Sequence, residues 1–250
     1  MTASAGGIER VVGTLQQRLD DLPTGLEARR PFLATYQRTT IAVGEAVTGA
    51  GFEDPAWVEE WDVAFADLYL AALDADLSGT GRVPRPWRLA FDAPADLPAL
   101  RQVLLGINAH INFDLPQALL AVISDDEFAQ PALLDSRRRD HERIDEVLST
   151  RVAAEDDELA ATTARTTVDR VLKPLNRRAS KRFLREARQK VWHNTAELQR
   201  ARLAGPDAYA VRLAELELLS AAKIADLLAP GQVLLRLAVA GFGVTLPPPA

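Results

Sequence analysis

Apolar residues along most of the chain recur every three or four positions, the spacing of helices with one buried face. Alternating β-branched runs, which are typical of strands, are scarce. We therefore predict an all-α protein with about eight helical segments, bounded mostly by proline and glycine. The predicted segments are residues 8–22, 29–48, 55–77, 96–113, 126–152, 155–173, 178–203 and 206–228, and residues 116–124 either continue segment 96–113 or form a helix of their own.

Several boundaries depend on single residues. Asp96 is the expected N-cap of segment 96–113, with Pro98 in the first turn. Pro116 lacks a backbone N–H, so the residues after it either continue the preceding helix beyond a kink or start a new helix. The run SGTGRVPRP, residues 78–86, is predicted to be a loop.

The segments contain no internal repeat. We expect them to pack as a bundle around one core with a buried polar cluster. The predicted domain spans residues 1–245, and a proline-rich tail spans residues 246–250.

Helical phase places one carboxylate of segment 55–77 toward the core. Each residue advances by roughly 100°, so positions three, four and seven apart share a face. Asp62 lies on the face of Phe65 and Tyr69, whereas Asp67 lies on the opposite, polar face. Because a buried carboxylate must be paired, hydrogen-bonded or protonated, Asp62 is a candidate site residue.

The stretch GINAHINFDLP, residues 106–116, carries four polar side chains in a run otherwise suited to a core. His110 and Asp114 flank its apolar arc on one side, and Asn108 and Asn112 flank it on the other. Side chains four residues apart on a helix are neighbours, so His110 and Asp114 can share a hydrogen bond or a ligand. The carboxylate would favour the charged imidazolium or fix the tautomer of the ring.

A second pair with this spacing, His141 and Asp145, borders the core face of segment 126–152. Asp140 and Arg137 fall on the same side of that segment. These residues extend the candidate polar cluster to another helix.

Segment 178–203 places Asn194 in its apolar arc and Trp192 at the margin. His193 and Glu197 have the spacing of a metal-binding pair but lie on the polar side. We therefore favour Trp192 and Asn194 over His193 as site residues.

The stretch at residues 106–116 resembles the signature of a family of actinobacterial proteins classified as a domain of unknown function. Members of that family carry a run close to Gly-Met-Asn-Ala-His-Ile-Asn-x-Asp-Leu-Pro. The resemblance extends to the runs FEDPAW at 52–57, WDVAFADLY at 61–69 and WHNTAEL at 192–198.

Other positions agree with this resemblance or depart from it. Trp192 and Asn194 match a Trp-x-Asn-Ala run of the family. Around Asp140 the family has Asp-Phe-x-x-Ile-Asn, from which His141 and Asp145 depart. This departure argues against a metal site at His141 and Asp145 that the whole family shares. The resemblance implies no particular reaction.

The polar residues indicate two classes of function. In the first, the protein is an enzyme that acts on a small organic molecule, such as a natural product, by acid–base or metal-assisted chemistry. In the second, the domain binds a ligand or a protein without catalysis, and its polar cluster is structural. The expected catalytic residues are His110, Asp114, Asp62 and Asp140, and the expected substrate-binding residues are Asn108, Asn112, Asp145, Trp192, Asn194 and Tyr69.

A divalent metal is a variant of the enzyme hypothesis. His110, Asp114 and Asp145 offer nitrogen and oxygen ligands suited to Zn, Mn or Fe. The chain has three histidines and lacks a Glu-x-x-His motif, which argues against a di-iron bundle. The run SDDEF at 124–128 resembles an aspartate-rich magnesium motif, but it also has the pattern of an N-cap with an acidic first turn.

The composition of the chain narrows the range of possible binding partners and locations. The formal net charge of −6 argues against nucleic acid as the main partner, although residues 165–202 are rich in Lys and Arg. The absence of cysteine excludes disulfides and thiolate chemistry. The N-terminal residues do not have the pattern of a signal peptide, and the longest apolar run, 233–244, is too short to span a membrane. We expect a cytoplasmic protein, for which 206–228 and 233–244 offer either a homodimer face or additional core.

Overall fold

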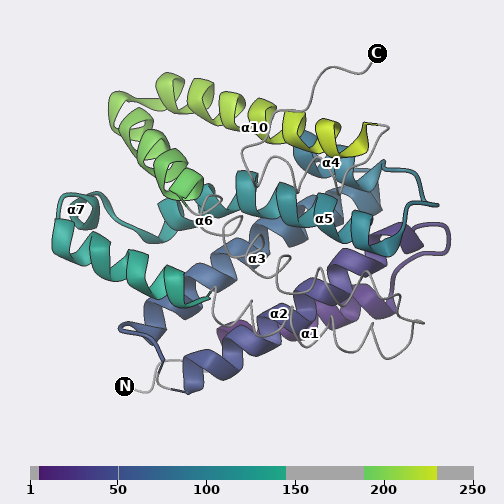
Figure 1. Cartoon of the computed structure of the whole chain (residues 1–250), viewed down its shortest axis with the longest axis horizontal. Coiled ribbons are helices and arrows are strands. Elements are labelled where there is room, and N and C mark those ends of the chain that lie inside the picture. Colours follow the sequence, from purple (N-terminus) through teal and green to yellow (C-terminus); the bar gives the residue numbers. More distant parts are fainter. Residues whose placement is uncertain (1–5, 50, 145–188, 230–250) are drawn as a thin grey trace, which may run out of the picture.

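The computed structural model describes residues 6–49, 51–144 and 189–229. Within these ranges the chain forms helices and connecting turns with no strand, which confirms the all-α prediction (Figure 1). The named elements are α1 (Gly7–Asp20), the 3₁₀ turn η1 (Glu27–Arg29), α2 (Arg30–Thr48), α3 (Pro55–Ser78), α4 (Arg85–Phe91), α5 (Ala99–Ala109), the π-helical turn η2 (His110–Asp114), α6 (Leu115–Val122), α7 (Asp125–Phe128) and α10 (Pro206–Leu228). Residues 131–144 and 189–204 are also helical.

Helix α3 is the longest of the named helices and contacts elements on several sides. The Asp54 carboxylate caps its first turn by accepting the backbone N–H of Trp57 at 3.1 Å. Gly79 ends the helix with a φ of 64°, a left-handed conformation that glycine adopts without strain. Helix α3 contacts α1, α2 and α6. Figure 1 shows α1 and α2 along one long side of the fold and α10 along the other.

Helices α5 and α6 form one continuous helical segment joined by the π turn η2. The backbone N–H of Leu115 donates to the carbonyl of His110, five residues earlier, instead of the usual four. Pro116 follows this wider turn directly and cannot donate to the α-helical ladder. The expected kink at Pro116 is therefore a π turn, and His110 and Asp114 are its first and last residues.

Three boundaries differ from the predictions. Helix α4 begins at Arg85, inside the stretch 78–86 that was predicted to be a loop, and its seven residues are too few to show a helical period. Asp96 does not cap α5, because Pro98 occupies the N-cap and a turn from Pro94 to Leu97 precedes it. Segment 126–152 begins as the short α7, and a second helix starts at Pro131 after a break.

Some predicted features lie outside the described residues. They are segment 155–173, the start of segment 178–203, the apolar run 233–244 and the tail 246–250. In the described part of the chain, no helix combines the length and the apolar character needed to cross a membrane.

A close helix contact positions the ring of Phe32 against α5. A Cβ atom built on Gly106 would lie 2.4 Å from the Phe32 ring, far inside van der Waals contact. The Phe32 ring also lies 6.0 Å from the imidazole of His110, one turn further along the chain. Gly106 therefore permits the approach of α2 to α5 that brings an aromatic wall to His110.

We expect Gly106→Ala to lower the free energy of unfolding by about 1–3 kcal/mol, because the added methyl group must displace the Phe32 ring. The matched control is Gly13→Ala in the exposed middle of α1, where a Cβ meets nothing within 4 Å. That substitution should stabilise the protein by roughly 0.5–1 kcal/mol through helix propensity. Urea unfolding measures both, and equal effects would contradict the close contact.

Candidate functional site

The buried pair His110 and Asp114 forms the centre of the candidate site. The imidazole Nδ1 lies 2.9 Å from Asp114 Oδ2, as their spacing predicted. The indole N–H of Trp87, from α4, donates to the same Oδ2 at 2.7 Å. Only 3% of His110 and 1% of Asp114 is exposed, so this three-residue network lies in the interior.

The network assigns the protons on the imidazole ring. Burial lowers the pKa of His110 well below its ordinary value, so the ring is neutral near pH 7. Burial raises the pKa of Asp114, and the hydrogen bond from Trp87 opposes that rise. The indole of Trp87 can only donate to Oδ2, and we adopt the tautomer in which the Nδ1–H of His110 donates to the same oxygen. Nδ1 then carries the hydrogen of His110, and Nε2 carries a lone pair.

Aromatic rings from three helices enclose His110. Phe65 of α3 stacks on the imidazole with ring centres 3.5 Å apart and planes 6° apart. The edge of Tyr36, from α2, approaches with a centroid distance of 4.6 Å. Tyr69 and Trp87 lie 5.9 Å away. The imidazole is thus oriented by packing as well as by hydrogen bonding.

Four buried polar atoms in this region have no hydrogen-bond partner among the described residues: His110 Nε2, Asp62 Oδ2, Tyr36 Oη and Tyr69 Oη. Burial raises the pKa of Asp62 to about 7. Burial raises the pKa of Tyr36, the charges of Asp62 and Asp114 raise it further, and an interaction of its hydroxyl with the Thr40 side chain lowers it. Because folded proteins pair nearly all buried polar atoms, we call these four side chains the unpaired group.

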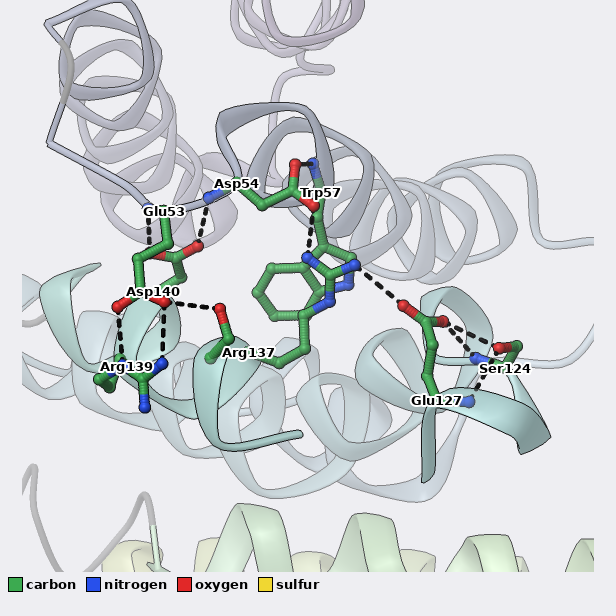
Figure 2. Close-up of polar contacts among 9 residues, drawn as sticks. Glu53, Asp54, Trp57, Ser124, Glu127, Arg137, Arg139 and Asp140 are labelled. Carbon is green, nitrogen blue, oxygen red and sulfur yellow. Dashed lines mark hydrogen bonds and ion pairs between the residues drawn. The ribbon is translucent and has the colours of Figure 1, made fainter. Parts of the chain in front are cut away.

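Asp140 belongs to a different cluster and not to the unpaired group. Its carboxylate accepts the backbone N–H groups of Glu53 at 2.7 Å and Asp54 at 2.8 Å, just before α3 begins (Figure 2). Arg137 donates to Asp54 at 2.6 Å and to Glu127 at 2.9 Å. These bonds attach helix 131–144 to the start of α3, so the structure gives Asp140 a supporting position.

An open cleft of about 740 Å³ lies beside Arg137, and His110 is not among its lining residues. The guanidinium of Arg137 lies 4.8 Å from the centre of the Trp57 ring, which also lines the cleft. Its charged lining residues are Asp54, Glu60, Asp125, Glu127, Arg137 and Arg202. The four carboxylates therefore outnumber the two guanidinium groups.

A row of stacked rings along α3 connects the cleft to the unpaired group. Trp57 stacks on Trp61 with centroids 6.3 Å apart, and Trp61 stacks on Phe65 at 5.9 Å. Phe65 then stacks on His110. The indole N–H groups of Trp57 and Trp61 are buried and have no partner in the described chain. The row thus places unused donors between the cleft and the unpaired group.

The predicted amides have other partners. Asn108 donates to the carbonyl of Leu104, and Asn112 donates to the carbonyl of Asn108, both within their own helical segment. Asn194 is only half-buried and accepts from Arg212 of α10 at 3.2 Å.

The remaining residues predicted for the site lie at separate positions in the structure. The indole of Trp192 donates to His141 Nδ1 at 3.0 Å, and this buried contact joins two other helices. His193 is exposed, as predicted. Asp145 lies outside the described residues. Tyr69, whose ring lies 5.9 Å from the imidazole, is therefore the predicted residue that the structure brings to His110, and the buried Asp62 lies one turn before Phe65 on the same helix.

No three His, Asp or Glu side chains among the described residues lie close enough together to hold a metal ion. His110 and Asp114 supply only two of the expected ligands. The third expected ligand, Asp145, lies outside the described residues.

Sequence reasoning missed Trp87 and Tyr36. Trp87 lies on α4, where Pro86 in the first turn was a signal for a helix start, although Trp87, Leu89 and Phe91 alternate with a period of two. Tyr36 lies within a correctly predicted helix, but its apolar spacing indicated only core. Neither hydrogen bonds nor ring stacking between helices can be predicted from the pattern of one helix.

We expect Asp140→Asn to lower the free energy of unfolding by roughly 1.5–3 kcal/mol. The amide oxygen can accept one of the two backbone N–H groups, but the NH₂ group then faces the other N–H. Asp135→Asn is the control, because the exposed ion pair of Asp135 with Arg138 contributes about 0–1 kcal/mol. Urea unfolding gives both values, and a neutral Asp140→Asn would contradict the supporting role.

The raised pKa of Asp62 predicts that stability falls as pH rises from about 4 to about 7. In that range the folded protein keeps the proton that an unfolded aspartate, with a pKa near 3.9, has lost. The loss is on the order of 4 kcal/mol and should be absent in Asp62→Asn. Urea unfolding across this range, with the exposed Asp67→Asn as control, measures it. A pH dependence shared by wild type and Asp62→Asn would contradict the burial of an unpaired carboxyl.

No curated protein and no solved structure matches the chain. A family model described as a family of unknown function, DUF5995, matches residues 8–230. This range includes the unpaired group, the Asp140 cluster and α10. The chain therefore belongs to the DUF5995 family.

Proposed function

We propose that the protein is an enzyme that transfers a proton to or from a small organic molecule, with His110 as the general base. The observation that carries the proposal is the free Nε2 of His110, held in place from the other side of the ring by Asp114 and Trp87. A general base needs an unprotonated atom, a fixed orientation and room for one partner atom. The network supports the first two requirements, and Nε2 has no hydrogen-bond partner in the described chain. The third requires the side chains around His110 to move, because the ring is buried.

Asp114 has the role of a positioning residue in this proposal. It accepts the Nδ1–H of His110 and so keeps the lone pair on Nε2. It would also stabilise the imidazolium that forms when Nε2 takes a proton. Trp87 anchors Asp114 from α4, so a rotation of the carboxylate would break two hydrogen bonds.

Asp62 is the second titratable group of the proposed site. Burial raises its pKa to about 7, so both protonation states are populated near neutral pH. Such a group can return the proton that His110 removes, because efficient acid–base residues have a pKa close to the working pH. The hydroxyls of Tyr36 and Tyr69 supply further polar contacts for a bound molecule.

A second candidate is a helical domain without catalysis, in which this cluster is structural. The observation that favours it is burial, since His110, Asp114 and Asp62 are each at least 96% buried. A substrate would have to enter by displacement of side chains. The two candidates predict different results for a variant without His110: the enzyme loses turnover, whereas a domain without catalysis has no turnover to lose.

We expect His110→Gln to reduce turnover by roughly 100-fold or more while the protein stays folded. The assay incubates the full chain with a bacterial small-molecule extract and follows the consumption of metabolites by mass spectrometry. His193→Gln is the matched control, because the side chain of His193 is 67% exposed and its ion-pair partner is Glu197, which is not part of this network. Circular dichroism and urea unfolding check the fold.

Equal turnover by His110→Gln and wild type would contradict the proposal. If His110→Gln does not fold, ¹⁵N NMR of the wild-type imidazoles provides the second measurement. The proposal expects a protonated Nδ1 and an unprotonated Nε2 on His110 near pH 7. A protonated Nε2 would contradict it without any variant.

A further inference from the structure

The large apolar side chains that are exposed in the described part of the chain are concentrated between residues 203 and 219. More than half of each residue is open to solvent in the set Leu203, Val211, Leu218 and Leu219. Three of them belong to α10, which lies along one side of the fold in Figure 1. Helix α10 packs against α4, α5 and η2 with its opposite face, which carries the buried Leu216, Ile224 and Leu227. Clustered exposure of large apolar side chains marks a surface for another protein.

The exposed surface of α10 carries a continuous apolar stripe. Helical phase, at roughly 100° per residue, gathers its members within an arc of about 80°, and they are Val211, Ala214, Leu218, Ala222 and Ala225. Leu219 borders this arc, and we call these six residues the α10 face. The stripe is symmetric about Leu218, with members four and seven residues away on both sides. An interface between identical copies needs a patch that is complementary to itself, and a symmetric stripe meets this requirement when two helices run antiparallel.

Charged residues line the edge of the α10 face on the side of Leu219. In chain order they are Arg212, Glu215, Lys223 and Asp226. When two copies of α10 run antiparallel about Leu218, this edge meets itself in the reverse direction. Arg212 then lies opposite Asp226 of the second copy, within about 3 Å along the helix axis. Glu215 lies opposite Lys223 of the second copy with the same small offset, so each charge meets an opposite charge.

These charges are available for a second copy, and their pattern selects one orientation. The side chains of Lys223 and Asp226 are exposed and have no hydrogen-bond or ion-pair partner among the described residues. Glu215 pairs with Arg212 on its own helix at 3.0 Å, but its side chain is still 57% exposed. In a parallel pair the charged edge would face the opposite edge of the partner helix, where the neutral Ala210 lies. The charge pattern therefore favours the antiparallel pair.

We propose that the α10 face binds a second copy of this chain, with the two α10 helices antiparallel and Leu218 at the two-fold axis. The pairing buries Leu218 and Leu219 against the same residues of the second copy and places oppositely charged side chains together along one edge. It goes beyond the proposed function, since no residue of the α10 face belongs to the unpaired group. A single helix pair is smaller than a standard interface of about 800 Å² per partner, so we expect a dissociation constant on the order of 10 μM.

Sedimentation velocity on the full chain, across a range on the order of 1 to 300 μM, tests the dimer. We expect a monomer at the low end of this range and a dimer at the high end. Leu218→Glu places two carboxylates opposite each other at the two-fold axis and should weaken dimerisation by roughly thirtyfold or more. The matched control is Ala132→Glu, which adds the same charge at an exposed apolar position of helix 131–144 and should leave the dimer unchanged. Circular dichroism confirms that both variants are folded.

An exchange of charges tests the antiparallel orientation. Glu215→Lys or Lys223→Glu alone places like charges opposite each other, and each should weaken the dimer by roughly tenfold. The double variant restores opposite charges between residues 215 and 223 and should recover most of the wild-type affinity. These two positions are about 12 Å apart along their own helix, so the recovery reports a contact between copies.

Three outcomes would overturn the proposal. The first is a chain that stays monomeric over the whole concentration range. The second is a dimer that Leu218→Glu leaves intact, because the copies would then meet through another surface. The third is a double variant that dimerises no better than either single variant, which would exclude the antiparallel pair. The role of His110 is measured by turnover and does not depend on these results.

Discussion

The rest of the interior depends on the hydrogen bonds that converge on Asp114. A carboxylate buried this deeply would cost several kcal/mol without partners, and the N–H groups of Trp87 and His110 supply them. The two bonds attach the short helix α4 to the π turn η2. They also hold the imidazole of His110 against the rings of Tyr36 from α2 and Phe65 from α3. One interaction therefore fixes both a helix packing and the orientation of a titratable ring.

The π turn explains why this network lies where it does. A turn with one extra residue widens the helix and changes the direction of the side chains that follow. Pro116 stands directly after that turn, where a regular ladder would need its missing N–H. Turns of this kind inside α-helices are frequent at functional sites. The combination of a π turn with two buried titratable side chains makes this the most unusual part of the described backbone.

Helical phase predicted burial well, because the face that meets the core follows from the apolar pattern of each helix alone. It placed Asp62, His110 and Asp114 inside and His193 outside, as the structure shows. It could not predict which buried groups meet, since that depends on packing between helices. Asp140 and His110 were expected at one site, yet Asp140 accepts the amides before α3.

Local competition for hydrogen bonds explains why the predicted amides Asn108 and Asn112 are not part of the site. Asn108 and Asn112 lie at the predicted positions, but each reaches a carbonyl four residues earlier on its own chain. Asparagine side chains form such local hydrogen bonds readily, and these bonds cannot be predicted from the helical phase of a residue. Trp87 was missed for another reason, because a seven-residue helix is too short for its apolar period to be recognised.

The contrast between two buried aspartates favours a ligand site over a purely structural cluster. Both oxygens of Asp140 accept backbone N–H groups, and its neighbour Arg137 bridges two carboxylates. The carboxylate of Asp140 and the two outer nitrogens of Arg137 thus have partners that serve the fold, whereas Arg137 Nε has none among the described residues. Asp62 Oδ2, His110 Nε2 and two tyrosine hydroxyls are left unsatisfied together, within one ring-lined region. A structural network would be selected for complete pairing, since each unpaired atom lowers stability. Incomplete pairing of several atoms in one place is instead the pattern of a site whose remaining partner is a ligand, because real proteins depart from local rules chiefly where they function.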